Sequence, residues 1–404
     1  MENTESREIK LGVFGTQRGQ AFIKAVALID GAKITGICDK NPKRVEDALK
    51  ACPPDTVVYE TFDELIDSGI DGVILANYFT EHAEFAIKAL EKGVAVLSET
   101  MAASTIAKCV ALCRTVEKTG GLYVFAENYP FARGTWELEK ICQKDTLGKV
   151  CFAEGEYVHP TSPAESASLA PEEWHWRKFL PATYYSSHAL APLMHITKAM
   201  PKRVTAMCAL GTDENIEQMN RIRADVAGVM LVYTDQDSVF RVNGSTYLAP
   251  HANWYRLSGL NGAAETVRGN EKCVRLVYND WSRPENMPKI SSYEPLYPTN
   301  EKEASKCGHG GGDYWITRQF IECIRDKKEH FFNVYRAVAI SAVAIYGWRS
   351  ALEGGKPYEI PDFSNEEVRH SLENDNLTPF PTADRPNDLP FSTVPVDENH
   401  HMVR

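Results

Sequence analysis

The first residues with an evident chemical use form a glycine-bearing turn near the start of the chain. The apolar run 10–14 leads into Gly15-Thr16-Gln17-Arg18-Gly19, and an apolar-periodic segment over 20–29 follows. Glycines let a backbone approach a diphosphate, and a following helix offers free N–H groups and the positive end of its dipole. The turn is one residue shorter than G-x-G-x-x-G and lacks its middle glycine, so an ordinary strand–helix turn is the alternative.

A carboxylate follows at the spacing that a nucleotide site requires. The apolar run 33–38 ends at Asp39, about 20 residues beyond the turn, where an acid can accept hydrogen bonds from both ribose hydroxyls. A carboxylate there repels a 2′-phosphate and favours NAD over NADP, although Lys40 and Arg44 lie close by and soften that preference. Strand, turn and acid together predict that Gly15–Gly19 and Asp39 bind NAD.

The elements that must position these residues alternate in type over about residues 9–127. Short apolar strands are separated by amphipathic helices, which predicts a parallel sheet covered on both faces. In such sheets ligands bind beyond the carboxyl ends of the strands. Four polar residues fall just past predicted strand ends and are therefore expected beside the cofactor: Asn77, His82, Glu99 and Asn128.

The pattern changes after about residue 130. Alternating apolar and polar residues over 225–278, interrupted by turns, predict several antiparallel strands. We therefore predict an α/β protein with a doubly wound parallel sheet in a domain over 1–128. A second, α+β domain with a large open, mostly antiparallel sheet is expected over 129–365, and a tail over 366–404 is expected to pack on the surface. A broad open sheet often pairs with its copy, so we expect a homodimer or homotetramer.

Composition limits the partners of the chain. The 404 residues carry a net charge of −11, which argues against nucleic acid or an anionic membrane as the main partner. Residues 1–8 are polar and acidic, and no apolar run reaches the roughly 20 residues that span a bilayer. We therefore expect a cytoplasmic protein with reduced cysteines. The histidines show no ligand spacing in the sequence, so no metal site is predicted.

Taken together, these motifs resemble the Gfo/Idh/MocA oxidoreductases, such as glucose–fructose oxidoreductase and inositol dehydrogenase. The family has a Rossmann domain followed by an α/β domain whose sheet forms the dimer. Its dehydrogenases usually carry Glu-Lys-Pro after the fifth strand, and the lysine serves proton transfer at the alcohol carbon. Here Glu99-Thr100-Met101 stands in that place, and Thr100 cannot act as that acid or base.

Several short blocks are similar to the NAD-dependent glycosidases of glycoside hydrolase family 109. Residues 184–192 are similar to that branch's Tyr-Pro-Thr-His-Gly-Leu-Gly-Pro, residues 18–20 to its Arg-Gly-Gln, and residues 155–159 to its Gly-Ala-Tyr-Ile-His. The resemblance implies a sugar site lined by Tyr157, Arg177, Tyr185, His188 and Tyr255. The block 308–313, a glycine cluster followed by an aspartate, also fits, so His309 is expected at the mouth of the cleft, and Glu99 is expected beside the nicotinamide ribose.

The chemistry that this resemblance implies needs no pair of opposed carboxylates. A ring hydroxyl, at C3, is oxidised with NAD, the substituent at C1 leaves by elimination, water adds, and the ketone is reduced. Either Tyr157 or His188 is expected to take the hydroxyl proton, and Tyr185 to stabilise the enolate oxygen. Arg177 would orient polar substituents through its fixed fork of donors.

Other interpretations of the same residues stay open. His188 opens an apolar helix and could cap it, and Arg177 stands among aromatic residues and could serve packing. One alternative function is a simple NAD-dependent dehydrogenase of a sugar or inositol, with tyrosine or histidine relaying the proton. Another is a non-catalytic NAD-binding sensor.

Overall fold

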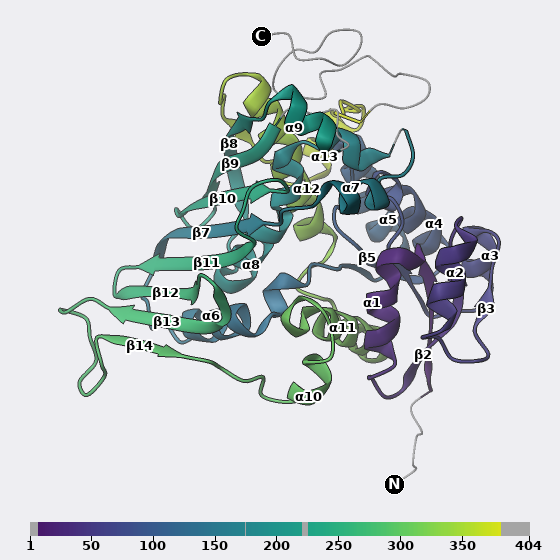
Figure 1. Ribbon diagram of the computed structural model, residues 1–404, viewed down its shortest axis with the longest axis horizontal. Coiled ribbons are helices and arrows are strands. Elements are labelled where there is room, and N and C mark those ends of the chain that lie inside the picture. Colours follow the sequence, from purple (N-terminus) through teal and green to yellow (C-terminus); the bar gives the residue numbers. More distant parts are fainter. Residues whose placement is uncertain (1–6, 174, 220–224, 381–404) are drawn as a thin grey trace. The chain divides into compact units, whose positions relative to one another are not determined.

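The computed structural model describes residues 7–173, 175–219 and 225–380. Two compact units make up the chain, and each is described by itself (Figure 1). Within the described residues, unit 1 is drawn from Met1–Ala132, Leu296–Val338 and Phe363–Asn374. Unit 2 is drawn from Arg133–Pro295, Ala339–Asp362 and Asp375–Arg404.

Unit 1 is built on a six-stranded sheet in the order β3-β2-β1-β4-β5-β6, with every pairing parallel. Strands β2 and β3 are added on one side of β1, and β4, β5 and β6 on the other. Open parallel sheets bind ligands at the point between β1 and β4 where the strand order changes side. The parallel sheet predicted from the sequence is therefore confirmed. The elements are β1 (Ile9–Phe14), α1 (Thr16–Val26), β2 (Ala32–Cys38), α2 (Pro42–Leu49), β3 (Val57–Val58), α3 (Phe62–Asp67), β4 (Gly72–Leu75), α4 (His82–Glu91), β5 (Ala95–Ser98), α5 (Ile106–Thr119) and β6 (Tyr123–Phe125), with short 3₁₀ turns at Phe79–Glu81 and Tyr129–Phe131.

Local sequence explains where these elements begin and how closely they pack. The Thr61 side chain accepts a hydrogen bond from the backbone N–H of Glu64, and the Glu64 side chain accepts one from the backbone N–H of Thr61. This capping box starts α3. A Cβ atom on Gly19 would lie 2.5 Å from Cγ1 of Val13, so the glycine lets α1 pack directly against β1. The result is a rigid junction between the first strand and the first helix.

Segments from the second half of the chain complete unit 1. These are α10 (Glu301–Ala304), a 3₁₀ turn at His309–Gly311, α11 (Gly312–Asp326) and α13 (Glu366–Leu372). Helix α11 packs against α1, and Arg114 forms ion pairs with Glu366 and Glu373. The sequence predicted one continuous domain over 129–365, whereas the compact units divide that range between them. Of the predicted tail, residues 381–404 lie outside the described part of the chain.

Unit 2 is built on a nine-stranded sheet in the order β14-β13-β12-β11-β7-β10-β9-β8-β15. Strands β7 and β10 pair in parallel, and the other pairings among the described strands are antiparallel, which confirms the mostly antiparallel sheet. The elements are α6 (Arg133–Gln143), β7 (Val150–Val158), α7 (Pro163–Leu169), α8 (Ser187–Thr197), β8 (Pro201–Leu210), α9 (Asp213–Gln218), β9 (Asp225–Thr234), β10 (Val239–Ser245), β11 (Ala252–Gly259), β12 (Gly262–Val267), β13 (Asn270–Tyr278), β14 (Ile290–Tyr293) and β15 (Tyr358–Glu359), with 3₁₀ turns at Trp176–Phe179 and Ala182–Ser186, while α12 (Val334–Leu352) has residues in both units.

The two faces of this sheet differ. Helix α8 packs against β7, β10 and β11, and α6 packs against β12 and β13. Figure 1 shows these strands side by side as teal and green arrows. On β9 the buried residues Met230 and Val232 alternate with Val229, Leu231 and Tyr233, which are 42%, 46% and 39% exposed. One face is therefore the core of unit 2, and the other presents apolar side chains to solvent.

Candidate cofactor and sugar sites

The predicted phosphate turn has a backbone that only glycine permits. Gly15 has φ 88°, and a Cβ atom there would lie 2.5 Å from the backbone atoms of Ala76 and Asn77. The turn therefore brings the end of β1, the start of α1 and the end of β4 within contact distance. The free N–H groups of a helix start bind diphosphates, so this cradle fits a dinucleotide.

Asp39 lies at the end of β2 and faces the same turn. Its carboxylate accepts hydrogen bonds from the backbone N–H of Thr16 at 2.6 Å and from the Thr16 hydroxyl at 3.0 Å. The backbone N–H of Asn41 donates to the other carboxylate oxygen at 2.9 Å. These bonds hold the carboxylate beside the first turn of α1, where the ribose of a bound nucleotide needs an acceptor.

A charged network in unit 1 brings four of the predicted site residues together. The Arg18 guanidinium donates from Nε to Glu99 at 2.6 Å and from Nη2 and Nη1 to Asp313 at 2.6 and 3.2 Å. Asp313 also accepts from Asn128 Nδ2 at 2.9 Å and bonds His309 Nδ1 at 2.8 Å. The network thus joins residues predicted for the cofactor and for the sugar in one place.

Asp313 lies in a block that fits the resemblance, but sequence reasoning assigned it no role in the site. It is 1% exposed, so burial alone would raise the pKa of its carboxyl group, but the charge of Arg18 and the hydrogen bond of His309 outweigh burial and hold that pKa well below its usual range. The sequence held one clue, an acid in the first turn of a helix directly after the glycine cluster.

The remaining predicted cofactor residues lie at strand ends of unit 1. His82 is 1% exposed, its Nδ1 lies 2.9 Å from the carbonyl oxygen of Met101, and burial lowers its pKa. The Oδ1 atoms of Asn77 and Asn128 are buried and have no hydrogen-bond partner among the described residues. Buried polar atoms nearly always have partners, so acceptors at these positions fit the donors of a bound cofactor.

A second group of predicted residues forms an aromatic cluster in unit 2. The Tyr157 ring centroid lies 4.7 Å from that of His188 and 5.4 Å from that of Tyr185. Arg177 donates from Nη1 to the Tyr185 hydroxyl at 3.3 Å, and its guanidinium lies over the Trp176 ring. The structure thus assembles two phenols, an imidazole and a guanidinium.

Close packing of α8 on β7 explains this assembly. A Cβ atom on Gly155 would lie 2.0 Å from the carbonyl oxygen of Ala189, so the glycine lets the first turn of α8 touch β7. Tyr255 on β11 donates its hydroxyl to the backbone carbonyl of His188 at 2.8 Å. This predicted sugar-site tyrosine therefore supports the backbone that carries the imidazole.

Two further histidines lie at the edge of the aromatic cluster. The His159 ring stacks on Tyr157 with centroids 5.9 Å apart, and its Nδ1 lies 3.2 Å from Nδ1 of His251. Over the described ranges, no three His, Cys, Asp or Glu side chains come together in a way that could hold a metal ion. In the same part of the chain, no helix has the length and apolar character needed to cross a bilayer.

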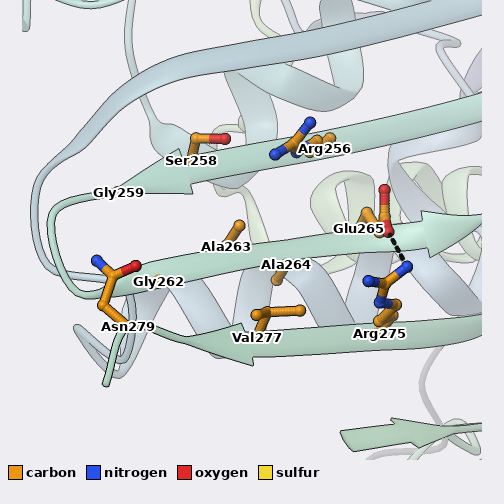
Figure 2. A pocket seen from close by; sticks show the side chains of 10 residues that line it. All are labelled: Arg256, Ser258, Gly259, Gly262, Ala263, Ala264, Glu265, Arg275, Val277 and Asn279. Atoms are coloured by element: carbon orange, nitrogen blue, oxygen red, sulfur yellow. Dashed lines mark ion pairs between the residues drawn. The ribbon is translucent and has the colours of Figure 1, made fainter. Parts of the chain in front are cut away.

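The sheet of unit 2 also carries a hollow of about 460 Å³, shown in Figure 2. Figure 2 shows Arg256, Glu265 and Arg275 from three neighbouring strands, with Arg275 and Glu265 paired at 3.4 Å. Successive side chains of a strand point to opposite faces, so Arg256 lies on the face opposite Tyr255. The hollow therefore belongs to the exposed face of the sheet and is separate from the aromatic cluster.

Two family models match the chain, one in its first part and the other in its second part. "Oxidoreductase family, NAD-binding Rossmann fold" matches residues 9–127, and "Glycosyl hydrolase 109, C-terminal domain" matches residues 192–369. Fold and phosphate turn define the class, an NAD-binding oxidoreductase of the Rossmann type. The first part of the chain thus matches the Gfo/Idh/MocA oxidoreductases and the second part matches the glycosyl hydrolase 109 proteins, and the resemblance inferred from the sequence is confirmed.

Individual relatives agree with this assignment. A glycosyl hydrolase family 109 protein of Stenotrophomonas maltophilia is 23% identical over 89% of this chain and 89% of its own length. An alpha-N-acetylgalactosaminidase of Tannerella forsythia is 24% identical over 90% of this chain and 87% of its own. Among solved structures, a levoglucosan dehydrogenase in complex with NADH and levoglucosan has the same fold, with a TM-score of 0.74 and 16% identity over 88% of this chain and 100% of that chain.

Proposed function

We propose that this protein cleaves a glycoside by NAD-dependent oxidation of the sugar ring at C3, followed by elimination, addition of water and reduction. The aromatic cluster of unit 2 carries the proposal, because it unites Tyr157, Tyr185 and His188 with a guanidinium donor. The matches to glycosyl hydrolase 109 proteins support glycosides as the substrate class.

The residues of unit 1 fit the cofactor. Gly15 and the first turn of α1 would hold the diphosphate, and Asp39 would accept the hydroxyls of the adenosine ribose. The buried amide oxygens of Asn77 and Asn128 offer acceptors. Bound NAD would supply the hydride acceptor for the C3 carbinol and the hydride donor for the final ketone.

The residues of unit 2 would handle the protons and the orientation of the sugar. Tyr157 or His188 takes the proton of the C3 hydroxyl during oxidation and returns it at the end of the cycle. The C3 ketone acidifies the C2 proton, and Tyr185 stabilises the resulting enolate oxygen by hydrogen bonding. The base that removes the C2 proton passes it to the C1 oxygen, whose substituent leaves as an alcohol. Water then adds across the C1–C2 double bond, with its hydroxyl on C1 and its proton on C2, and the hydride returns to C3, so the cycle is redox-neutral.

A simple sugar dehydrogenase is the second candidate, and one observation bears on it. Thr100 stands where the similar dehydrogenases carry the lysine that serves proton transfer, which weighs against this function. A dehydrogenase would need a tyrosine or histidine to relay the proton instead.

One assay separates the two functions. Purified protein and NAD are mixed with a panel of aryl glycosides and free sugars, and both aglycone release and NADH absorbance are followed. Aglycone release without net NADH supports the proposal. Net NADH from a free sugar would favour the dehydrogenase, and binding of NAD without either reaction would contradict both.

We also propose that two copies pair through the exposed face of the nine-stranded sheet. Met207 is 68% exposed and Leu231 46%, and Glu154 sits between Arg241 and Arg256 at 2.7 and 3.5 Å. An apolar patch beside alternating charges suits contact with a second copy of the same face. Light scattering of the purified protein would give a dimer or tetramer, and Leu231→Arg would shift it toward the monomer. A wild-type monomer at micromolar concentration would contradict this proposal.

A further inference from the structure

We propose that Asp313 is a positioning residue of the NAD site, which it serves by holding the Arg18 guanidinium in one orientation. Asp313 lies about 190 residues beyond the range that the NAD-binding family model matches, yet it belongs to unit 1. The inference rests on NAD binding by unit 1 and is independent of the sugar chemistry.

The Arg18 guanidinium presents a fork of donors at the start of α1. Arg18 lies in the first turn of α1, beside the Gly15 turn, and its guanidinium carries five N–H donors in a plane. Nε donates to Glu99, while Nη1 and Nη2 donate one bond each to Asp313. Among the described residues this leaves two N–H donors, one on each terminal nitrogen, on a side chain that is 29% exposed. These are the donors that a diphosphate at the helix start can accept.

Asp313 is itself fixed, which a positioning residue must be. It accepts from Asn128 and bonds His309, and its carboxylate is 1% exposed. A Cβ atom on Gly312 would lie 2.2 Å from the carbonyl oxygen of Asn128, so the start of α11 is held against that backbone. Because Asp313 is held in place, its ion pair with Arg18 restricts the rotamers of Arg18 before NAD binds. Less conformational entropy is then lost when Arg18 binds an anion.

The charge and the fixed position of Asp313 have opposite effects on the affinity for NAD. Its negative charge lowers the positive potential that Arg18 presents to a diphosphate, which weakens binding. Its fixed position holds the guanidinium, with its two remaining donors, in one orientation, which strengthens binding. A bidentate contact of this kind depends on direction as much as on charge, so the proposal requires that orientation outweigh charge.

The experiment measures NAD affinity of the full-length protein by calorimetry, with no sugar present. For Asp313→Asn we expect the Kd for NAD to rise at least tenfold. The matched control is Glu117→Gln, which breaks the 2.6 Å ion pair of Glu117 with the buried Arg369 elsewhere in unit 1. That variant should lose thermal stability but bind NAD with unchanged affinity.

A double-mutant cycle shows whether Asp313 acts through Arg18. In an Arg18→Gln background, Asp313→Asn should change the Kd for NAD less than twofold, because the side chain that it positions is gone. An additive loss would assign Asp313 a role independent of Arg18 and would overturn the proposal. Unchanged or tighter NAD binding by the single variant, in a protein that circular dichroism shows to be folded, would overturn it as well. Failure of the glycosidase assay would leave these results untouched.

Discussion

The two candidate sites are held together by different forces. In unit 1 the contacts are charge-assisted hydrogen bonds among Arg18, Glu99 and Asp313, with the carboxylate of Asp313 buried. In unit 2 the contacts are mainly between rings, with centroids of Tyr157, Tyr185 and His188 4.7 to 5.9 Å apart. Charge-assisted hydrogen bonds fix the orientation of the side chains that they join. Packed rings fix the position of the side chains, while their hydroxyl and N–H groups can bond to other partners.

This difference suits two different tasks. Under the proposed function the cofactor returns to its starting state in each cycle and needs a fixed binding site, which the Gly15 turn and the Arg18 network would provide. A sugar that passes through an alcohol, a ketone and an enol needs groups that can donate and accept a proton in turn. Phenols and imidazoles do this, and buried ion pairs do not. Damage to unit 1 should therefore affect NAD binding, and damage to the aromatic cluster should affect turnover alone.

The largest difference between an effect on turnover and an effect on NAD binding should come from His188→Ala. Loss of a general acid or base costs about 10²- to 10⁴-fold in turnover, while the Kd for NAD should stay within about twofold because the contacts proposed for NAD do not include His188. Aglycone release and calorimetric NAD titration measure the two effects. His195→Ala is the control, since His195 is a buried histidine on the same helix. Near-normal turnover of His188→Ala would remove His188 from the mechanism.

The converse change is Gly15→Ala in unit 1. Its methyl group would meet the Ala76 backbone at 2.5 Å and would also strain a residue at φ 88°. The strain alone is of order 1–3 kcal/mol, so we expect more than tenfold weaker NAD binding and a lower melting temperature. Calorimetry and thermal unfolding measure both effects. A variant that bound NAD as tightly as the wild type would show that the turn does not hold the diphosphate.

The charged network should also make unit 1 sensitive to acid. The pKa of Asp313 in the fold lies below that of an unfolded aspartate, because of Arg18 and His309 despite burial. The carboxylate therefore stabilises the fold above about pH 4–5, and that contribution is lost as the pH falls toward the folded pKa. We expect Asp313→Asn to cost about 2 kcal/mol at pH 7 and progressively less below pH 4. Urea unfolding at several pH values measures this, and a pH-independent difference would contradict it.

The smallest effect concerns the choice of nucleotide. Asp39→Ser removes the carboxylate that should repel a 2′-phosphate, so the ratio of the Kd values for NADP and NAD should fall about tenfold. NAD itself should bind somewhat more weakly, since Asp39 also anchors Thr16. Fluorescence titration with both nucleotides measures the ratio, and an unchanged ratio would show that Asp39 does not face the ribose.

The sequence predicted the local parts of this molecule better than the long-range ones. Continuous apolar strands and the Gly15 turn predicted the parallel sheet, because both depend on near neighbours in the chain. Asp313 was assigned no role because its part in the site depends on α11 packing against α1, almost 300 residues earlier in the sequence. The pairing of His159 with His251 was missed for the same reason.

Other residues were found only through the resemblance. Tyr185 and His188 stand in a stretch whose composition suits an ordinary buried helix start, and pattern alone does not separate them from packing residues. The structure adds that Tyr157 and His188 come together because Gly155 lets α8 touch β7. A sequence shows a glycine in a strand, but the close approach that it permits appears only in the fold.

Under the proposed function, the sugar ring is oxidised and loses its C2 proton before the glycosidic bond breaks. The most direct test is to run the reaction on an aryl glycoside with NAD in heavy water and to examine the released sugar by mass spectrometry and NMR. We expect one non-exchangeable deuterium at C2 in each released sugar, with no net NADH. Aglycone release with hydrogen retained at C2 would mean direct hydrolysis and would overturn the proposed function.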